Sequence, residues 1–292
     1  MRRIVPLFFF LIVCLLGGSV AESTELYREE TTVLLPPEYD IPATVCLPIG
    51  EGPFPAIVML PSTGSTRDEA GDAYMYAAHT LASQYGIASI RIDFPGNGES
   101  IADYKSYTLH SAVGDAKAAA QYMEQLDVID EDRIGVLGWG QGGTDALLAC
   151  AWEPETFKAV VTWAAAPDMR IDGFFSAKNY EEAKENGFYV MEFDWRDSLE
   201  VSLEWCEDVM NTDVIEEFRT KFFGPVLAIH GQEDSTVDSE WSTKVVEASS
   251  NIDSKTLLID GMDHTFNVLS GDFSALFTAV DATGEFFVLV LN

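Results

Sequence analysis

Basic side chains are scarce in this sequence. The 292 residues hold 17 lysines and arginines against 48 aspartates and glutamates, a formal net charge of −31. Such a surface repels the phosphates of nucleic acids and of anionic membranes, so neither is expected as a partner. It also slows the approach of anionic substrates and leaves neutral esters unaffected. The same excess charge keeps a protein soluble outside the cell.

Histidine and cysteine are also rare, with four residues of each. His79, His110, His230 and His264 are scattered, and no cluster of His, Cys and carboxylates has the spacing of metal ligands. The sequence therefore predicts neither a metal nor another cofactor. Asn-Xaa-Ser/Thr glycosylation acceptors are absent as well.

The first 21 residues have the pattern of a secretory signal. Two arginines precede an apolar run over residues 4–17, and Ser-Val-Ala at 19–21 has the small-x-small pattern of a cleavage site. The run is shorter than the roughly 20 residues that span a bilayer, which disfavours an uncleaved membrane anchor. We therefore expect a secreted protein, cleaved after Ala21, with a net charge of 15 − 48 = −33.

Cleavage there would leave Cys46, Cys150 and Cys206. Three thiols cannot all pair within one chain. Cys150 lies in an apolar run over residues 146–152 that is typical of a buried helix, where cysteine packs as a small apolar side chain. The state of the three cysteines stays open at this point.

From residue 55 onward, apolar runs alternate with segments of helical spacing. Two short strands, over 31–37 and 41–48, are expected to precede them as an antiparallel start. The later runs cover residues 55–60, 87–92, 133–139, 157–166, 225–231 and 254–259. Near-continuous apolar strands that alternate with helices predict an α/β fold, with a mostly parallel central sheet and helices on both faces. Ligands of such sheets bind at the carboxyl ends of the strands.

Residues 168–222, here called the insert, are too many for a simple crossover helix. They contain ten aromatic residues. An insert of this size over the carboxyl edge of a sheet indicates a cap, and we expect a minority of its rings to line a pocket while the others fasten it to the sheet. No repeat or low-complexity linker is present, so residues 22–292 are treated as one domain with an inserted cap.

The turn GWGQGG, residues 138–143, follows a predicted strand and opens a predicted helix. With a serine at its centre it would be the Gly-x-Ser-x-Gly nucleophile elbow of a hydrolase, but the central residue is Gly140. A Gly-rich turn before a helix can also bind a phosphate or a dinucleotide. That alternative is disfavoured, because the dinucleotide motif requires another glycine spacing and an acidic residue after the next strand.

Two further loops carry candidate catalytic residues. Asp234 follows the strand at 225–231, and His264 follows the strand at 254–259. Alone, each is an ordinary loop residue, since a loop Asp is commonly a turn or cap residue. Together they stand in the order elbow, acid and histidine, at gaps of 94 and 30 residues, which is the order expected for this fold.

From residue 53 to its end, the chain resembles the α/β-hydrolase superfamily, and within it the small-capped esterases of the feruloyl or cinnamoyl type. The resemblance rests on LPSTGSTRDEAG, RIDFPGNGES, GWGQGG, HGQEDSTVD and GMDHTF. It implies that Asp234 is the orienting acid and His264 the general base. The backbone N–H groups of Thr63 and Gln141 would form the oxyanion hole.

Three departures from the family pattern fall on the predicted catalytic face. Gly140 replaces the nucleophilic Ser, Pro61-Ser62 replaces the usual His-Gly, and Pro95 stands where Arg is common. The first removes the nucleophile, and the second puts the oxyanion geometry in doubt. Glycine adopts the strained backbone of an elbow at little cost, so the fold is expected to persist.

The sequence thus predicts an esterase-like protein that is strongly impaired or inactive as a serine hydrolase, and that binds a small aromatic, ester or acyl ligand under its cap. One alternative is slow hydrolysis by His-activated water or by a displaced Ser62 or Ser65; Thr144 is expected to point away. Another is that Gly140 is a variant residue of an active esterase. A purely structural role, the ester or amide specificity and the oligomeric state stay open.

Overall fold

The computed structural model describes residues 26–36, 38–170 and 175–291. The predicted signal segment, 1–21, lies outside the described residues. Within them, no helix is long and apolar enough to cross a membrane.

The main sheet has eight strands in the order β1-β2-β4-β3-β5-β6-β9-β10. Their bounds are β1 Tyr27–Leu34, β2 Ile41–Pro48, β3 Phe54–Leu60, β4 Ala88–Ile92, β5 Ile129–Trp139, β6 Val160–Trp163, β9 Val226–Gly231 and β10 Lys255–Ile259. β2 pairs antiparallel with β1 and β4, and the strands from β4 to β10 are parallel. The predicted α/β fold with an antiparallel start is confirmed.

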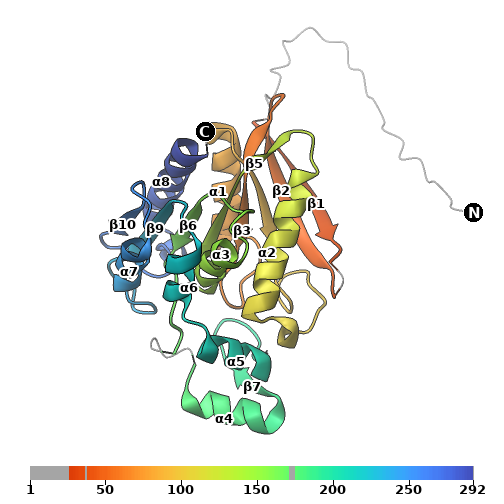
Figure 1. The fold of residues 1–292 in the computed structure, drawn as a ribbon, viewed down its shortest axis with the longest axis vertical. Helices are drawn as coiled ribbons and strands as arrows, with labels where there is room; N and C mark the ends of the chain where they lie inside the picture. Colours follow the sequence, from red (N-terminus) through yellow and green to blue (C-terminus); the bar gives the residue numbers. More distant parts are fainter. Residues whose placement is uncertain (1–25, 37, 171–174, 292) are drawn as a thin grey trace, which may run out of the picture.

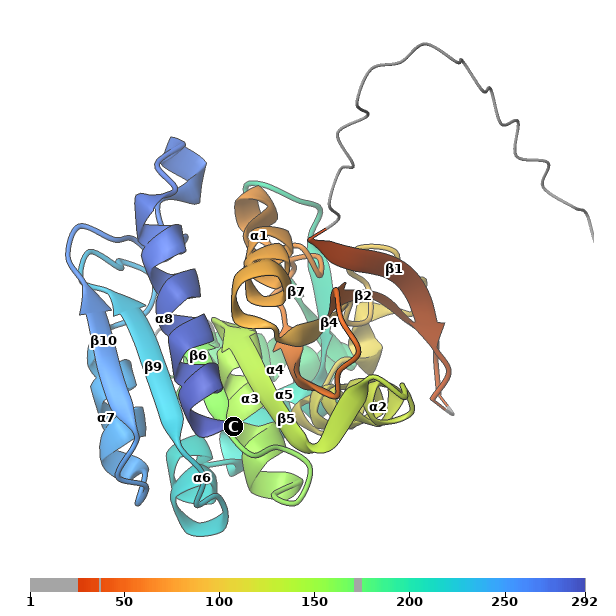
Figure 2. The same ribbon diagram turned by 90° about the horizontal axis from the view of Figure 1, so that it is seen from above.

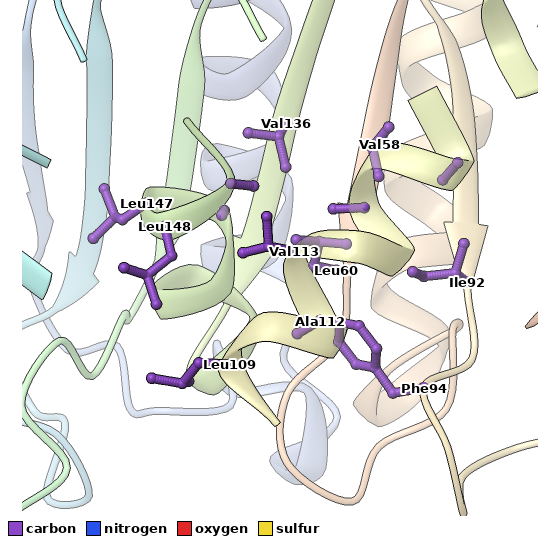
Figure 3. Packing of buried hydrophobic residues seen from close by; sticks show 14 of the residues in the cluster. Val58, Leu60, Ile92, Phe94, Leu109, Ala112, Val113, Val136, Leu147 and Leu148 are labelled. Carbon is purple, nitrogen blue, oxygen red and sulfur yellow. The ribbon is translucent and has the colours of Figure 1, made fainter. Parts of the chain in front are cut away.

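Helices cover both faces of this sheet (Figures 1 and 2). Their bounds are α1 Ala73–Thr80, α2 Leu109–Glu124, α3 Gln141–Trp152, α6 Val214–Lys221, α7 Glu240–Ala248 and α8 Ser274–Val290. One buried apolar cluster joins α2 and α3 to one face, and a second joins α1 and α8 to the other. Figure 3 shows the first cluster, where Val113 of α2 and Leu148 of α3 lie beside Val58 and Val136 of the sheet.

Short helical turns complete the main unit: Ala70–Asp72, Leu81–Tyr85, Tyr104–Ser106 and Val268–Ser270. Cys46, Cys150 and Cys206 are buried free thiols, and burial raises the pKa of Cys46 and Cys206 to about 12. Cys150 lies in α3, the buried helix expected from its apolar surroundings.

The insert forms α4 Ala177–Asn186, β7 Phe188–Met191, β8 Leu199–Ser202, α5 Leu203–Asn211 and α6. β7 and β8 make a separate two-stranded antiparallel sheet. α4, β7 and α5 project beyond the carboxyl edge of the main sheet (Figure 1), whereas α6 packs against α3.

Candidate active site

The glycine-rich turn packs directly on the end of β3. A Cβ at Gly138 would overlap the Gly142 carbonyl oxygen, and a Cβ at Gly142 would overlap the Leu60 carbonyl oxygen. Side chains are therefore excluded at positions 138 and 142, two residues before and after residue 140. Gly140 itself has φ 54° and ψ −118°, a backbone conformation that side chains with a Cβ rarely adopt. The elbow is thus built with the geometry of a nucleophile turn, although its central residue has no side chain.

Asp234 and His264 meet at the edge predicted from the order of the strands. The His264 Nδ1 lies 2.7 Å from the Asp234 Oδ2. The histidine therefore donates its Nδ1 hydrogen to the carboxylate, which leaves Nε2 as the basic nitrogen. An ideal Cβ built on Gly140 would lie 3.6 Å from this Nε2. The three predicted positions converge.

The Asp234 carboxylate is fully buried and richly hydrogen-bonded. His230, a buried residue at the end of β9, places its Nε2 3.0 Å from the Asp234 Oδ2, and the backbone N–H groups of Thr236 and Val237 donate to Oδ1 at 2.8 and 2.9 Å. Burial by itself raises the pKa of Asp234, but the hydrogen bonds of His230 and His264 outweigh it and hold the pKa well below its usual value. The acid is therefore anionic at neutral pH.

An aromatic cluster fixes the turn relative to the histidine loop. Trp139, the last residue of β5, stacks edge-on against Phe266 with ring centroids 4.9 Å apart, and its Nε1 donates to the His264 carbonyl at 3.1 Å. Trp163 of β6 lies 5.0 Å from the same Phe266 ring. Because these rings are buried, the distance between the turn and His264 is set by packing.

The predicted oxyanion residues lie beside the turn. Gln141 begins α3, where backbone N–H groups have no partner within the helix and the helix dipole attracts negative charge. Its side chain is turned away, since Nε2 donates to Asp145 at 3.2 Å. Thr63 and Gln141 line the same cavity as Gly140 and His264. Thr144, by contrast, donates its hydroxyl to the Ala166 carbonyl at 2.8 Å and points away, as expected.

The cavity in front of these residues has a volume of about 620 Å³. Its apolar walls come from both the main unit and the insert: Trp139, Ala166, Met169, Met191, Phe193, Trp195, Trp205, Val237 and Leu269. Three of the insert's rings thus face the cavity, while others such as Phe218 and Phe222 pack together on the main unit. Volume and lining suit a small, mostly apolar molecule.

Arg196 ties the insert to the main unit beside the cavity. Its guanidinium donates to the Gly64 carbonyl after β3 at 2.5 Å, to the Asn97 side chain, and to the Gly96 carbonyl at 3.4 Å. Burial lowers the pKa of Arg196 from its ordinary high value. The contact with residues 96 and 97 lies next to Pro95, one of the three departures from the family pattern.

Glu69 is a site residue that the sequence analysis missed. It is buried on the cavity wall, its φ is 62°, and its carboxylate accepts from the Ser62 backbone N–H. Burial raises the pKa of Glu69 to about 7, although hydrogen bonds from Ser62, Ser65 and Ala70 oppose the shift. His230 was also missed as a partner of the acid. Both residues lie within segments quoted above, Glu69 in LPSTGSTRDEAG and His230 in HGQEDSTVD, but nothing in their spacing shows that these side chains face Ser62 and Asp234.

Comparison with known proteins places this chain. Residues 78–275, more than half of it, match the model of the prolyl oligopeptidase family. The chain belongs to that family. The predicted α/β-hydrolase fold is confirmed by solved structures, among them Est1E from Butyrivibrio proteoclasticus with bound ferulic acid. That structure has a TM-score of 0.71 and 22% identity over 89% of this chain and 98% of Est1E.

Two characterised proteins are similar to this chain in sequence over part of their length. 2,6-Dihydropseudooxynicotine hydrolase of Paenarthrobacter nicotinovorans is 31% identical over 51% of this chain and 41% of its own length. Dipeptidyl peptidase family member 2 of Caenorhabditis elegans is 27% identical over 58% of this chain and 19% of its own length. The chain therefore spans less than half of the length of either relative. Its fold is that of the α/β hydrolases.

Proposed function

We propose that this protein slowly hydrolyses small uncharged carboxylic esters, with His264 as the general base and Asp234 as its orienting acid. The observation that carries the proposal is the convergence of three positions. His264 and Gly140 line one cavity, where a side chain of residue 140 would begin 3.6 Å from the His264 Nε2, and the buried Asp234 is hydrogen-bonded to His264. The N–H groups of Thr63 and Gln141 would stabilise the oxyanion.

The substrate class follows from the walls of the cavity. Tryptophan, phenylalanine and methionine side chains dominate, which suits an aromatic or short acyl group, and the net charge of −31 disfavours anions. Esters are favoured over amides, because an alkoxide leaves more readily than an amine and demands less from an altered site. The ferulic acid bound to the similarly folded Est1E agrees with an aromatic ligand.

A low rate is expected because no acyl-enzyme can form on Gly140. Removing the serine of a triad lowers kcat by roughly six orders of magnitude in a serine hydrolase, with a residual acceleration of a few thousand-fold from binding and the oxyanion hole. The attacking oxygen in this protein must come from another hydroxyl or from water that His264 deprotonates.

The test is the turnover of short-chain aryl esters by the wild type, by His264→Ala and by His110→Ala as a matched control. His110 is the exposed histidine at the start of α2, paired with Asp208. We expect slow turnover in the wild type and in the control, and none above background in His264→Ala. Equal rates in the wild type and His264→Ala would refute the proposal.

Binding without turnover is the second candidate function. Trp205 lines the cavity with an indole Nε1 that is buried and has no hydrogen-bond partner among the described residues. A ligand oxygen within reach of this N–H would satisfy it. This candidate predicts calorimetric binding of a phenolic acid ester to the wild type, no hydrolysis, and weaker binding to Trp205→Phe, which keeps the ring and lacks the N–H.

Export is proposed on sequence grounds alone. The charged start, apolar run and small-x-small pattern of residues 1–21 support cleavage after Ala21. The test is N-terminal sequencing of the protein recovered from the culture medium of an expressing host. A mature chain that begins at Glu22 is expected, and an intact N-terminus inside the cell would contradict the proposal.

A further inference from the structure

The side chain of Ser62 occupies the space that residue 140 leaves empty. Its Oγ lies 2.5 Å from the ideal Cβ position of residue 140, and the His264 Nε2 lies 3.6 Å from that same position. We propose that Ser62, at the end of β3, is the nucleophile of this protein. The inference rests on the proposed esterase function and identifies the oxygen that attacks.

The backbone of Ser62 is held from both sides. Its N–H donates to the buried Glu69 carboxylate, and its carbonyl accepts from the Ser65 N–H at 3.0 Å. Its hydroxyl forms no hydrogen bond with another residue in the described part of the chain. Ser62 therefore has a fixed Cα and an uncommitted Oγ on the cavity wall, and rotation about its χ1 redirects the hydroxyl alone.

At positions 62 and 140, this chain has the reverse of the residues in the family pattern. The resembled esterases have Gly at the position of Ser62 and Ser at the position of Gly140. Here the hydroxyl stands on the neighbouring strand end, and the glycine stands on the elbow. The two changes fit together, because a side chain at 140 would meet the Ser62 Oγ at 2.5 Å, closer than real Cβ contacts, so the Ser62 hydroxyl would have to rotate away.

Residues that line the cavity can carry out both acylation and deacylation of Ser62. Ser62 Oγ attacks the ester carbonyl and transfers its proton to the His264 Nε2, while the oxyanion faces the N–H groups of Thr63 and Gln141. The bond to the alkoxy oxygen then breaks, and His264 returns the proton to the leaving alcohol. Water, deprotonated by His264, hydrolyses the acyl-Ser62 ester and restores the hydroxyl. Hydrogen bonds of this kind often form only when substrate is bound.

A fluorophosphonate probe tests the assignment on the full chain. We expect one covalent adduct on the wild type, placed on Ser62 by fragmentation mass spectrometry. Ser62→Ala should lose the adduct and lose aryl ester turnover by on the order of 100-fold or more. Ser106→Ala, which removes an exposed hydroxyl far along the chain, should keep both. An adduct on Ser65, or on no residue, overturns the inference.

The failures of the two proposals differ. If Ser62→Ala keeps turnover that His264→Ala loses, water attacks directly, so the Ser62 assignment is wrong and the esterase proposal stands. If the wild type has no His264-dependent turnover, the esterase proposal itself fails, and the assignment of Ser62 falls with it.

The exchange variant Ser62→Gly/Gly140→Ser adds a test that expects a gain of activity, which a folding defect cannot produce. It keeps the composition of the site and restores the arrangement of the family. We expect the adduct to move from residue 62 to residue 140 and ester turnover to rise by on the order of 100-fold or more, since the hydroxyl then stands on the elbow. An exchange variant that is labelled at 140 beside a wild type that stays unlabelled would contradict the inference.

Discussion

The two sides of this site differ in how much of the family pattern they keep. On one side, Asp234 receives hydrogen bonds from His230, His264 and two backbone N–H groups, and every one of these contacts comes from β9, β10 or the loops that follow them. On the other side, the elbow has no side chain at Gly140, and the Ser62 Oγ from the loop after β3 lies 2.5 Å from where that side chain would begin. Base and acid are fixed by a network, whereas the hydroxyl depends on a single pair of residues.

The largest effect is expected on the side of the site that holds Asp234 and His264, here called the base side. In Asp234→Asn the amide cannot accept hydrogen bonds from both histidines as a carboxylate does. The His264 tautomer with its hydrogen on Nδ1 is then no longer favoured, and the buried His230 loses its anionic partner. We expect kcat/KM for an aryl ester to fall by about 10⁴-fold.

Stability is expected to fall in the same variant, because His230 is fully buried. The matched control is Glu233→Gln, an exposed neighbour that should change neither kcat/KM nor the thermal midpoint. Unchanged kinetics in Asp234→Asn would show that the acid has no part in turnover.

Motif order predicted the base side well, because Asp234 and His264 follow strands whose carboxyl ends share one edge of a parallel sheet. The predicted strands appear as β1–β6, β9 and β10, since long apolar runs leave few alternatives. The pair β7–β8 was not predicted, because its strands are four residues long and lie among polar residues. The sequence offered Ser62 and Ser65 as displaced nucleophiles but could not decide between them, since the approach of Ser62 to Gly140 depends on backbone packing between residues 78 positions apart.

Gly140→Ala tests the nucleophile side. Alanine at this position would have to adopt φ 54°, and its Cβ would lie 2.5 Å from the Ser62 Oγ. Backbone strain alone should lower the free energy of unfolding by about 1 to 3 kcal/mol, as measured by urea denaturation.

The steric share of that loss is separable by a double-mutant cycle. Combining Gly140→Ala with Ser62→Gly removes the contact but not the strain, so the double variant should be more stable than the sum of the single losses predicts. Strict additivity would mean that the two residues do not share one space.

Glu69, which holds the Ser62 backbone, is expected to make the stability of the protein depend on pH. Burial raises its pKa in the folded protein from 4.5 to about 7, so the folded state binds the proton more tightly than the unfolded state does. The stabilisation is complete below pH 4.5 and is lost as pH rises through about 7.

Glu69→Gln keeps an oxygen that accepts from the Ser62 N–H but does not titrate. The free energy of unfolding of the wild type, measured in urea, should therefore fall by about 3 kcal/mol more between pH 4.5 and pH 8 than that of the variant. Asp115 and Asp145, whose pKa values burial also raises, titrate in both proteins and cancel from the difference. Parallel pH profiles would place the Glu69 carboxyl in a more solvated setting.

The smallest effect is expected at the join between the insert and the two sides of the site. Arg196 connects the insert to the backbone after β3 and β4, but it contacts neither the elbow nor His264 in the described structure. In Arg196→Ala the wall formed by Phe193 and Trp195 loses its anchor, so substrate binding should weaken while the reacting groups stay in place. We expect KM for an aryl ester to rise about 3- to 10-fold with kcat nearly unchanged, the result of lost ground-state binding.

Lys178→Ala, an exposed change in α4 of the same insert, is the control and should leave both constants as they are. A fall in kcat instead of a rise in KM would mean that Arg196 positions Ser62 through Gly64, two residues along the loop.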